Sequence, residues 1–81
     1  MRGVVVSPVA KNGCVVIQME DKSYSALSNA QGCFEVGDEV SGELQYIGHK
    51  AYNETQQRHT EAVVEDCYCS RDRAFLVCRN G

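Results

Sequence analysis

Hydrophobic and polar residues alternate along the first twenty positions of the chain, in the pattern of two strands joined by a tight turn. The turn signal is Asn12-Gly13, because a two-residue type I′ turn needs positive φ at both central positions. Since strand residues alternate between faces, pairing Lys11 with Cys14 gives the hairpin one wholly apolar face. The predicted core face comprises Val4, Val6, Pro8, Ala10, Val15, Ile17 and Met19. The mixed face comprises Val5, Ser7, Val9, Cys14, Val16, Gln18 and Glu20. The pattern therefore predicts an opening β-hairpin over residues 3–21.

A proline interrupts the first strand of this hairpin. Pro8 has no backbone N–H to give to a sheet ladder, so the strand should be an edge there or carry a bulge. A register slip of one residue would turn Gln18 and Glu20 toward the core, which favours the pairing of Lys11 with Cys14.

Two further segments alternate in the same way. Residues 23–27 read as a third strand, and the turn before them could hold two, three or four residues. A three-residue turn places Leu27 in the core and Tyr24 on the mixed face, whereas the other lengths turn Tyr24 inward. Residues 38–47 read as a fourth strand, and one of its faces carries Val40, Gly42, Leu44 and Tyr46. The loop 28–37 between these strands is expected to be held to the core by Cys33, Phe34 and Val36.

Residues 48–60 fit two alternatives. The capping-box spacing of Asn53 and Gln56 would start a single helical turn. An extended excursion of the sheet fits the same residues equally well.

The last part of the chain predicts a closing hairpin. Residues 62–69 and 74–78 are both apolar enough to be strands, and residues 70–73 would form the turn between them. Pairing Cys69 with Ala74 places three thiols on one face, those of Cys67, Cys69 and Cys78.

Length and composition narrow the class of protein. The chain has 81 residues, of which 43% are hydrophobic and 23% charged, and no low-complexity run or internal repeat divides it. Frequent valine, regularly spaced glycine and the lack of a long helical stripe favour a single all-β domain over residues 1–81. Short strands at regular spacing predict a small closed or partly open barrel of five to six strands.

Charge and cysteine content exclude several function classes. Eight basic residues against eleven acidic ones give a net charge of -3, which argues against a non-specific nucleic-acid binder. No segment has the length of a membrane span or the pattern of a signal peptide, so we expect no membrane partner and a cytoplasmic location. In that compartment the five cysteines are expected to be reduced thiols packed as small hydrophobic residues.

The opening hairpin resembles the first two strands of cold-shock proteins, which are oligonucleotide-binding (OB) barrels. The matching positions are Gly3, Lys11-Asn12-Gly13, Ile17 and Glu20-Asp21, and Val36-Gly37-Asp38-Glu39-Val40 looks like the entry to the fourth strand of OB domains. The resemblance covers residues 3–44 and implies an OB-like barrel. Cold-shock barrels stack bases on exposed aromatic side chains of the first two strands. At the matching positions this chain has Ser7, Cys14 and Val16.

A second likeness is to the small soluble barrel of the NfeD family, partners of membrane proteases. Tyr24-Ser25-Ala26 and Val36-Gly37 resemble motifs of that barrel. The membrane spans that usually accompany it are absent from this chain.

Candidate nucleic-acid-binding residues lie at two predicted hairpin tips. Lys11, Arg71 and Arg73 would line one end of the groove of an OB barrel, because its long hairpin loops flank that groove. Tyr24 and Tyr68 are the aromatic side chains that could stack bases beside them.

Other reactive residues suggest weaker alternatives. Cys67, Cys69 and Cys78 could form a thiol or metal site, although strand spacing sets the first two about 7 Å apart, too far for a usual zinc knuckle. His49 and His59 fall in the irregular segment with nothing to bring them together. The acidic residues Glu35, Asp38, Glu39 and Glu43 read as a solvated face. No catalytic motif is recognisable, so we expect a protein that is not an enzyme and that binds no cofactor and no metal.

Two functions follow from these observations. The first is a single-stranded nucleic-acid-binding OB module that uses Lys11, Tyr24, Tyr68, Arg71 and Arg73. The second is a non-catalytic protein-interaction or assembly module, which binds a partner or a second copy through Val5, Val9 and Val16 of the mixed face.

Overall fold

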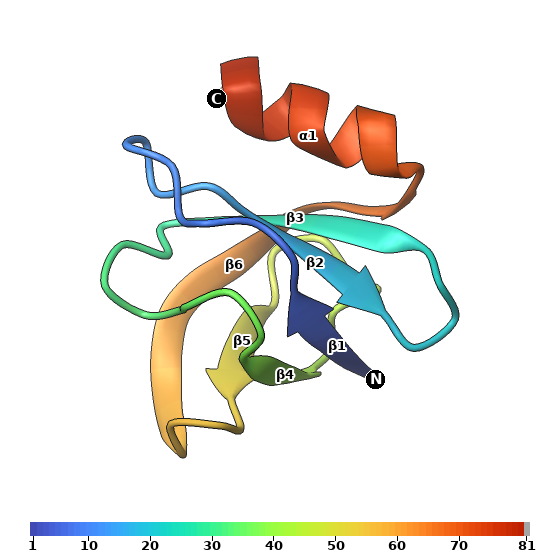
Figure 1. The fold of residues 1–81 in the computed structure, drawn as a ribbon. Coiled ribbons are helices and arrows are strands. Elements are labelled where there is room, and N and C mark those ends of the chain that lie inside the picture. The colour runs from blue at the N-terminus through green and yellow to red at the C-terminus, as the bar shows by residue number, and fades with distance from the viewer. Residues whose placement is uncertain (81) are drawn as a thin grey trace.

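The computed structural model describes residues 1–80 of the chain, which form six strands and one helix (Figure 1). The elements are β1 (Arg2–Val5), β2 (Val15–Met19), β3 (Tyr24–Ser28), β4 (Glu39–Gly42), β5 (Lys50–Asn53), β6 (Arg58–Cys69) and α1 (Arg71–Asn80). All strand pairs are antiparallel, and the order β1-β2-β3-β6-β5-β4 closes into a barrel. The predicted all-β class and small barrel are confirmed. No helix among the described residues has the length and apolar character needed to cross a membrane.

The barrel core comes from alternate residues of the strands, as their period of two requires. Val15, Ile17 and Met19 of β2 lie inside, as predicted, and Leu27 of β3 lies beside them. The rest of the buried cluster comprises Val5, Ala30, Cys33, Phe34, Val40, Leu44, Ala51, Ala62 and Val64. Val36 and Tyr46, which were expected to share this core, are instead 59% and 55% exposed, because both lie in loops.

The predicted register of the opening hairpin is wrong. Val5 lies opposite Ile17 and is 1% exposed, whereas Val4 points outward and is 41% exposed. The turn is longer than a type I′ turn: the N–H of Gly13 donates to the Ala10 carbonyl over 2.9 Å, and Gly13 is the residue with positive φ. The two-residue turn assumed from the sequence therefore has the wrong length, and the faces of the first strand are exchanged.

A bulge before Pro8 shifts the register further. The N–H of Ala10 donates to the Cys14 carbonyl, and Val5 pairs with Ile17. The five steps along the chain from Val5 to Ala10 therefore lie opposite only three, from Ile17 back to Cys14. Within the bulge, the N–H of Val16 donates to the Ser7 hydroxyl over 3.1 Å in place of a strand carbonyl. Pro8 itself lies beyond Val5, the last residue of β1, within this irregular stretch, whereas β1 is paired on both sides and is no edge.

The turn between β2 and β3 holds three residues. The N–H of Met19 donates to the Ser23 carbonyl over 2.8 Å, and Lys22 takes the positive φ that closes the turn. Of the three lengths considered, this is the one that buries Leu27 beside Val15 and leaves Tyr24 half-buried on the outer face.

Residues 48–60 form an extended excursion of the sheet. They supply β5, a turn, and the start of β6. Asn53 still acts as a cap, because its Oδ1 accepts the N–H of Gln56 over 2.9 Å. The residues of the capping-box spacing therefore close a turn rather than begin a helix.

A buried polar network joins this turn to the loop before β4. The Asp38 carboxylate accepts hydrogen bonds from Asn53 Nδ2 (2.9 Å), the Glu35 N–H (3.0 Å) and Gln56 Nε2 (2.8 Å). Asn53 Nδ2 also donates to the Cys33 carbonyl over 2.8 Å. The hydrogen bond from Asn53 is the main reason that the pKa of Asp38 is lowered, with the Glu35 and Gln56 bonds adding to it.

The predicted closing hairpin is wrong, because residues 71–80 form the helix α1. Ser70 caps the helix: its hydroxyl accepts the N–H of Arg73 over 3.2 Å, and its carbonyl accepts the N–H of Ala74. Asp72 lies in the first turn, where a carboxylate is favourable to the helix dipole. The strand predicted over residues 62–69 is part of β6, and α1 then lies across the outside of β2 and β3 (Figure 1).

Candidate functional site

Four of the five residues predicted to bind nucleic acid lie at the junction of β6 and α1. Tyr24 is paired with Cys69 at the end of β6, and a bulge in β6 gives Tyr68 a φ of 54°. Tyr68 is 58% exposed, and Arg71 and Arg73 are exposed in the first turn of α1. The structure therefore brings the backbone of these four residues to one corner of the molecule.

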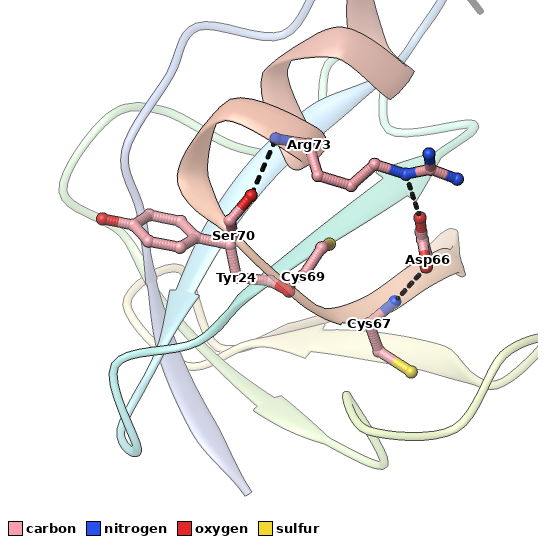
Figure 2. A network of polar contacts seen from close by, with 6 residues as sticks. All are labelled: Tyr24, Asp66, Cys67, Cys69, Ser70 and Arg73. Carbon is pink, nitrogen blue, oxygen red and sulfur yellow. Dashed lines mark hydrogen bonds and ion pairs between the residues drawn. The ribbon is translucent and has the colours of Figure 1, made fainter.

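The charged side chains at this corner have partners within the chain (Figure 2). Arg73 Nε lies 3.3 Å from Asp66 Oδ2, and the Arg71 guanidinium stands 5.2 Å above the centre of the Phe75 ring. In Figure 2 the Tyr24 ring extends away from the Arg73 side chain. The Arg73 and Tyr24 side chains thus do not converge on one surface.

Lys11 lies at the other end of α1. Its neighbour Asn12 donates from Nδ2 to the Cys78 carbonyl over 3.1 Å, in the last part of the helix. Seven residues of helix, about 10 Å at 1.5 Å per residue, separate Cys78 from Arg71. Lys11 and the two arginines therefore lie near opposite ends of α1.

The outer face of β2 and β3 is covered by α1. Val16 and Ala26 are paired, point away from the barrel core and are fully buried. Ala74 of α1 is also fully buried. The predicted interaction surface is consequently wrong in its residues. Val5 lies in the core, Val9 packs against the core, and Val16 lies under the helix.

A disulfide joins Cys14 at the start of β2 to Cys78 of α1. The two residues are 64 positions apart in the chain, and their Cα atoms are 5.2 Å apart, within the usual range for this bond. The expectation that all five cysteines are reduced is therefore wrong for this pair. A groove of about 260 Å³ opens beside the bond and is lined by Ser7, Pro8, Ala10, Cys14, Val16, Phe75 and Cys78.

The remaining two cysteines of the predicted thiol site act as hydrogen-bond donors to the backbone. Cys67 Sγ donates to the Gln45 carbonyl and Cys69 Sγ donates to the Tyr24 carbonyl, each over 3.1 Å. Burial, and then the nearby Asp66 carboxylate, raises the pKa of both thiols. Because helix formation moves Cys78 away to pair with Cys14, the three-thiol site is not formed. Among residues 1–80, His, Cys, Asp and Glu side chains make no group of three that could hold a metal ion.

Large apolar side chains are exposed where the loop between β4 and β5 lies alongside β6. The N–H of Gly48 donates to the Val64 carbonyl over 2.8 Å, and Cys67 bonds to the carbonyl of Gln45. Between these anchors Tyr46 is 55% exposed and Ile47 is 65% exposed. Tyr68, the next residue of β6 after Cys67, is a separate exposed side chain. We name Tyr46 and Ile47 the apolar patch.

The histidines and the acidic residues remain separate features. The His49 ring lies 5.8 Å from that of Tyr46, and the His59 ring lies edge-on to that of Tyr52 at 4.8 Å. Of the acidic residues, Asp38 is buried in the polar network, and Glu35, Glu39 and Glu43 are exposed.

Two features of this region were missed in the sequence. The helix α1 had a signal, since Ser70 followed by Asp72 is typical of a helix start. The disulfide had none, because spacing along a chain does not predict which cysteines meet.

Comparison of the chain with protein-family models, curated proteins and solved structures finds no match.

Proposed function

We propose that the protein is a non-catalytic protein-interaction module that binds a second copy of itself through the apolar patch. The observation that supports this is the exposure of Tyr46 and Ile47, 55% and 65%, at neighbouring positions of the loop between β4 and β5. Tyrosine is among the residues from which protein interfaces draw most of their binding energy, and apolar side chains fill the centre of an interface. The barrel of residues 1–80 is closed, so its six strands offer no free edge to a partner and the proposed contact is made by side chains.

The net charge of the chain and the helix that covers β2 and β3 also favour a protein partner over a nucleic acid. OB barrels take oligonucleotides on the face around strands 2 and 3. Here the outer face of β2 and β3 carries α1, and the net charge of the chain is -3. Binding through Lys11, Tyr24, Tyr68, Arg71 and Arg73 is therefore the second function in rank.

The test is sedimentation velocity over about 10 μM to 1 mM protein, which brackets binding free energies of about -7 to -4 kcal/mol. We expect a concentration-dependent dimer that Ile47→Asp weakens by about tenfold or more, as for a central interface residue. Val36→Asp is the matched control, because Val36 is a loop residue of similar exposure, 59%, outside the apolar patch.

Two outcomes would contradict the proposal. One is a monomer at every concentration, or a dimer that both variants weaken equally. The other is tight binding of labelled single-stranded DNA or RNA that weakens steeply with salt, since that slope reports released counterions.

The finer assignments from the sequence belong to the same proposal. We assign the barrel to the OB type, although it has one strand more than the five of that fold. The families that we propose it resembles are the cold-shock proteins and the NfeD barrels. A cytoplasmic location is part of the proposal too. There the Cys14–Cys78 bond would meet cellular dithiols that keep most protein thiols reduced.

A further inference from the structure

The helix α1 is held to the barrel by its packing on β2 and β3 and by covalent links at its two ends. Ala74 is the fully buried side chain among the described positions of the helix, whereas Leu76 is 46% exposed and Phe75, Val77 and Cys78 are half-buried. A ten-residue helix is marginal in water on its own. Its first turn is continuous with β6, and its last turn is joined to β2 by the disulfide.

That disulfide can be reached from outside. The groove of about 260 Å³ runs between the β1–β2 loop and α1, with Pro8 and Ala10 on one wall and Phe75 on the other. Cys14 is buried, whereas Cys78 is half-buried. Because exchange depends on which sulfur a thiolate can approach, the more exposed residue of the pair, Cys78, is the expected point of attack.

We propose that the Cys14–Cys78 bond is a thiol–disulfide exchange site, and that its reduction by a dithiol releases α1 from the face of β2 and β3. One thiolate of the dithiol bonds to Cys78 Sγ and breaks the bond between the two cysteines. The electron pair leaves on Cys14 as a thiolate, which takes a proton. The second thiol of the dithiol then displaces Cys78, so the dithiol becomes a disulfide and the protein gains two thiols.

Release of the helix leaves the barrel intact. The core cluster contains neither Cys14 nor Cys78, and it lies on the opposite side of β2 and β3 from the helix. Val16 and Ala26, which are buried under α1, become exposed to solvent. The inference stands on the disulfide and its groove, and it does not depend on self-association through the apolar patch.

The first part of the test counts and locates thiols. Protein kept without reductant should show three reactive thiols after denaturation, those of Cys33, Cys67 and Cys69, and five after treatment with dithiothreitol. Glutathione, a monothiol, should be trapped on Cys78 and be identified there by peptide mass spectrometry. Five thiols before reduction, or a glutathione adduct on Cys14 alone, would overturn the proposal.

The second part measures release by hydrogen exchange. On reduction, the amides of residues 74–78 should exchange about tenfold faster or more, because a free helix of this length frays. The amides of β2 should keep their rates. The double variant Cys14→Ser/Cys78→Ser should match the reduced protein, and Cys67→Ser, which removes a thiol outside the bond, should match the oxidised wild type. Unchanged helix amides, or loss of protection throughout the barrel, would overturn the proposal.

Discussion

Replacing Asn53 by alanine is the substitution that best tests the role of the buried polar network. Asn53 is fully buried and makes three hydrogen bonds. It donates to the Cys33 carbonyl over 2.8 Å and to the Asp38 carboxylate over 2.9 Å, and it accepts the N–H of Gln56 over 2.9 Å. The variant thus removes two bonds between the loop before β4 and the turn between β5 and β6 and one bond within that turn, and it leaves the bond from Gln56 Nε2 to the Asp38 carboxylate.

The expected loss follows from these three bonds. A hydrogen bond to a charged group contributes about 1.5–3 kcal/mol, and each of the other two contributes about 0.5–1.5 kcal/mol. Gln56 is exposed, so water can replace the bond to its N–H, whereas the Cys33 carbonyl is left without its donor. We therefore expect Asn53→Ala to lower the free energy of unfolding by about 3–4 kcal/mol.

The assay is urea denaturation followed by far-ultraviolet circular dichroism. Gln31→Ala is the matched control, because the Gln31 side chain makes one exposed hydrogen bond, to the Lys11 carbonyl over 2.9 Å. The control should lose less than about 1 kcal/mol. In a double-mutant cycle with Asp38→Ala, the coupling energy should be about 2 kcal/mol. A loss below about 1 kcal/mol for Asn53→Ala, or additive effects in the cycle, would refute the reasoning.

Three further predictions concern the pH dependence, the helix start and the packing of β1. The pKa of Asp38 is lowered by folding, so its contribution to stability is complete above the unfolded pKa, about 3.9, and is lost as the pH falls through the folded value. Asp38→Asn should therefore flatten the acid side of a plot of urea midpoint against pH, and an unchanged slope would count against this cause. Ser70→Ala should cost about 1 kcal/mol by removing the helix cap, and it should speed amide exchange in the first turn of α1 while leaving β2 unaffected. Gly3→Ala should destabilise the barrel by about 1–3 kcal/mol in thermal melts, because the added Cβ would lie 2.5 Å from Ile17 Cγ2 and 2.9 Å from the Gln18 carbonyl oxygen. An unchanged melting temperature would show that β1 can shift to make room.

The barrel could be predicted from alternation because each strand buries one face. The core positions of β2 and β4 follow directly from that pattern, as Ile17 and Val40 show, whereas the burial of Leu27 in β3 depends on the length of the turn before it. The first strand could not be placed, because two local irregularities changed its register. The turn before Gly13 is longer than the two-residue form, and the Ser7 hydroxyl replaces a carbonyl in the ladder.

The helix was missed because its residues also fit a strand. Ala74 and Leu76 alternate with Phe75 and Val77, so apolar residues stand on both faces of a hypothetical strand and the period does not decide. The cap at Ser70 decides in favour of a helix. This signal comes from residues next to one another in the chain and not from the hydrophobic period.

The candidate site could be predicted only in part. Tyr24, Tyr68, Arg71 and Arg73 do come to one corner, since β3 and β6 are paired there. Lys11 does not join them. A helix in place of the second strand carries Cys78 toward Cys14, near the opposite hairpin tip. The outer face of β2 and β3 is covered only because that helix is present, so the residues of the two strands did not by themselves predict the covering.

The Cys14–Cys78 bond also divides the chain into a covalent ring and a tail. Residues 14–78 belong to the ring, which holds β2 through β6 and most of α1, whereas β1 lies in the tail before it. A single protease cut within the ring leaves its two pieces joined through sulfur. A cut between Val5 and Cys14 frees β1, the strand that closes the barrel between β2 and β4. In the oxidised protein, β1 is therefore the one strand of the described chain that can be lost or exchanged while the ring stays whole.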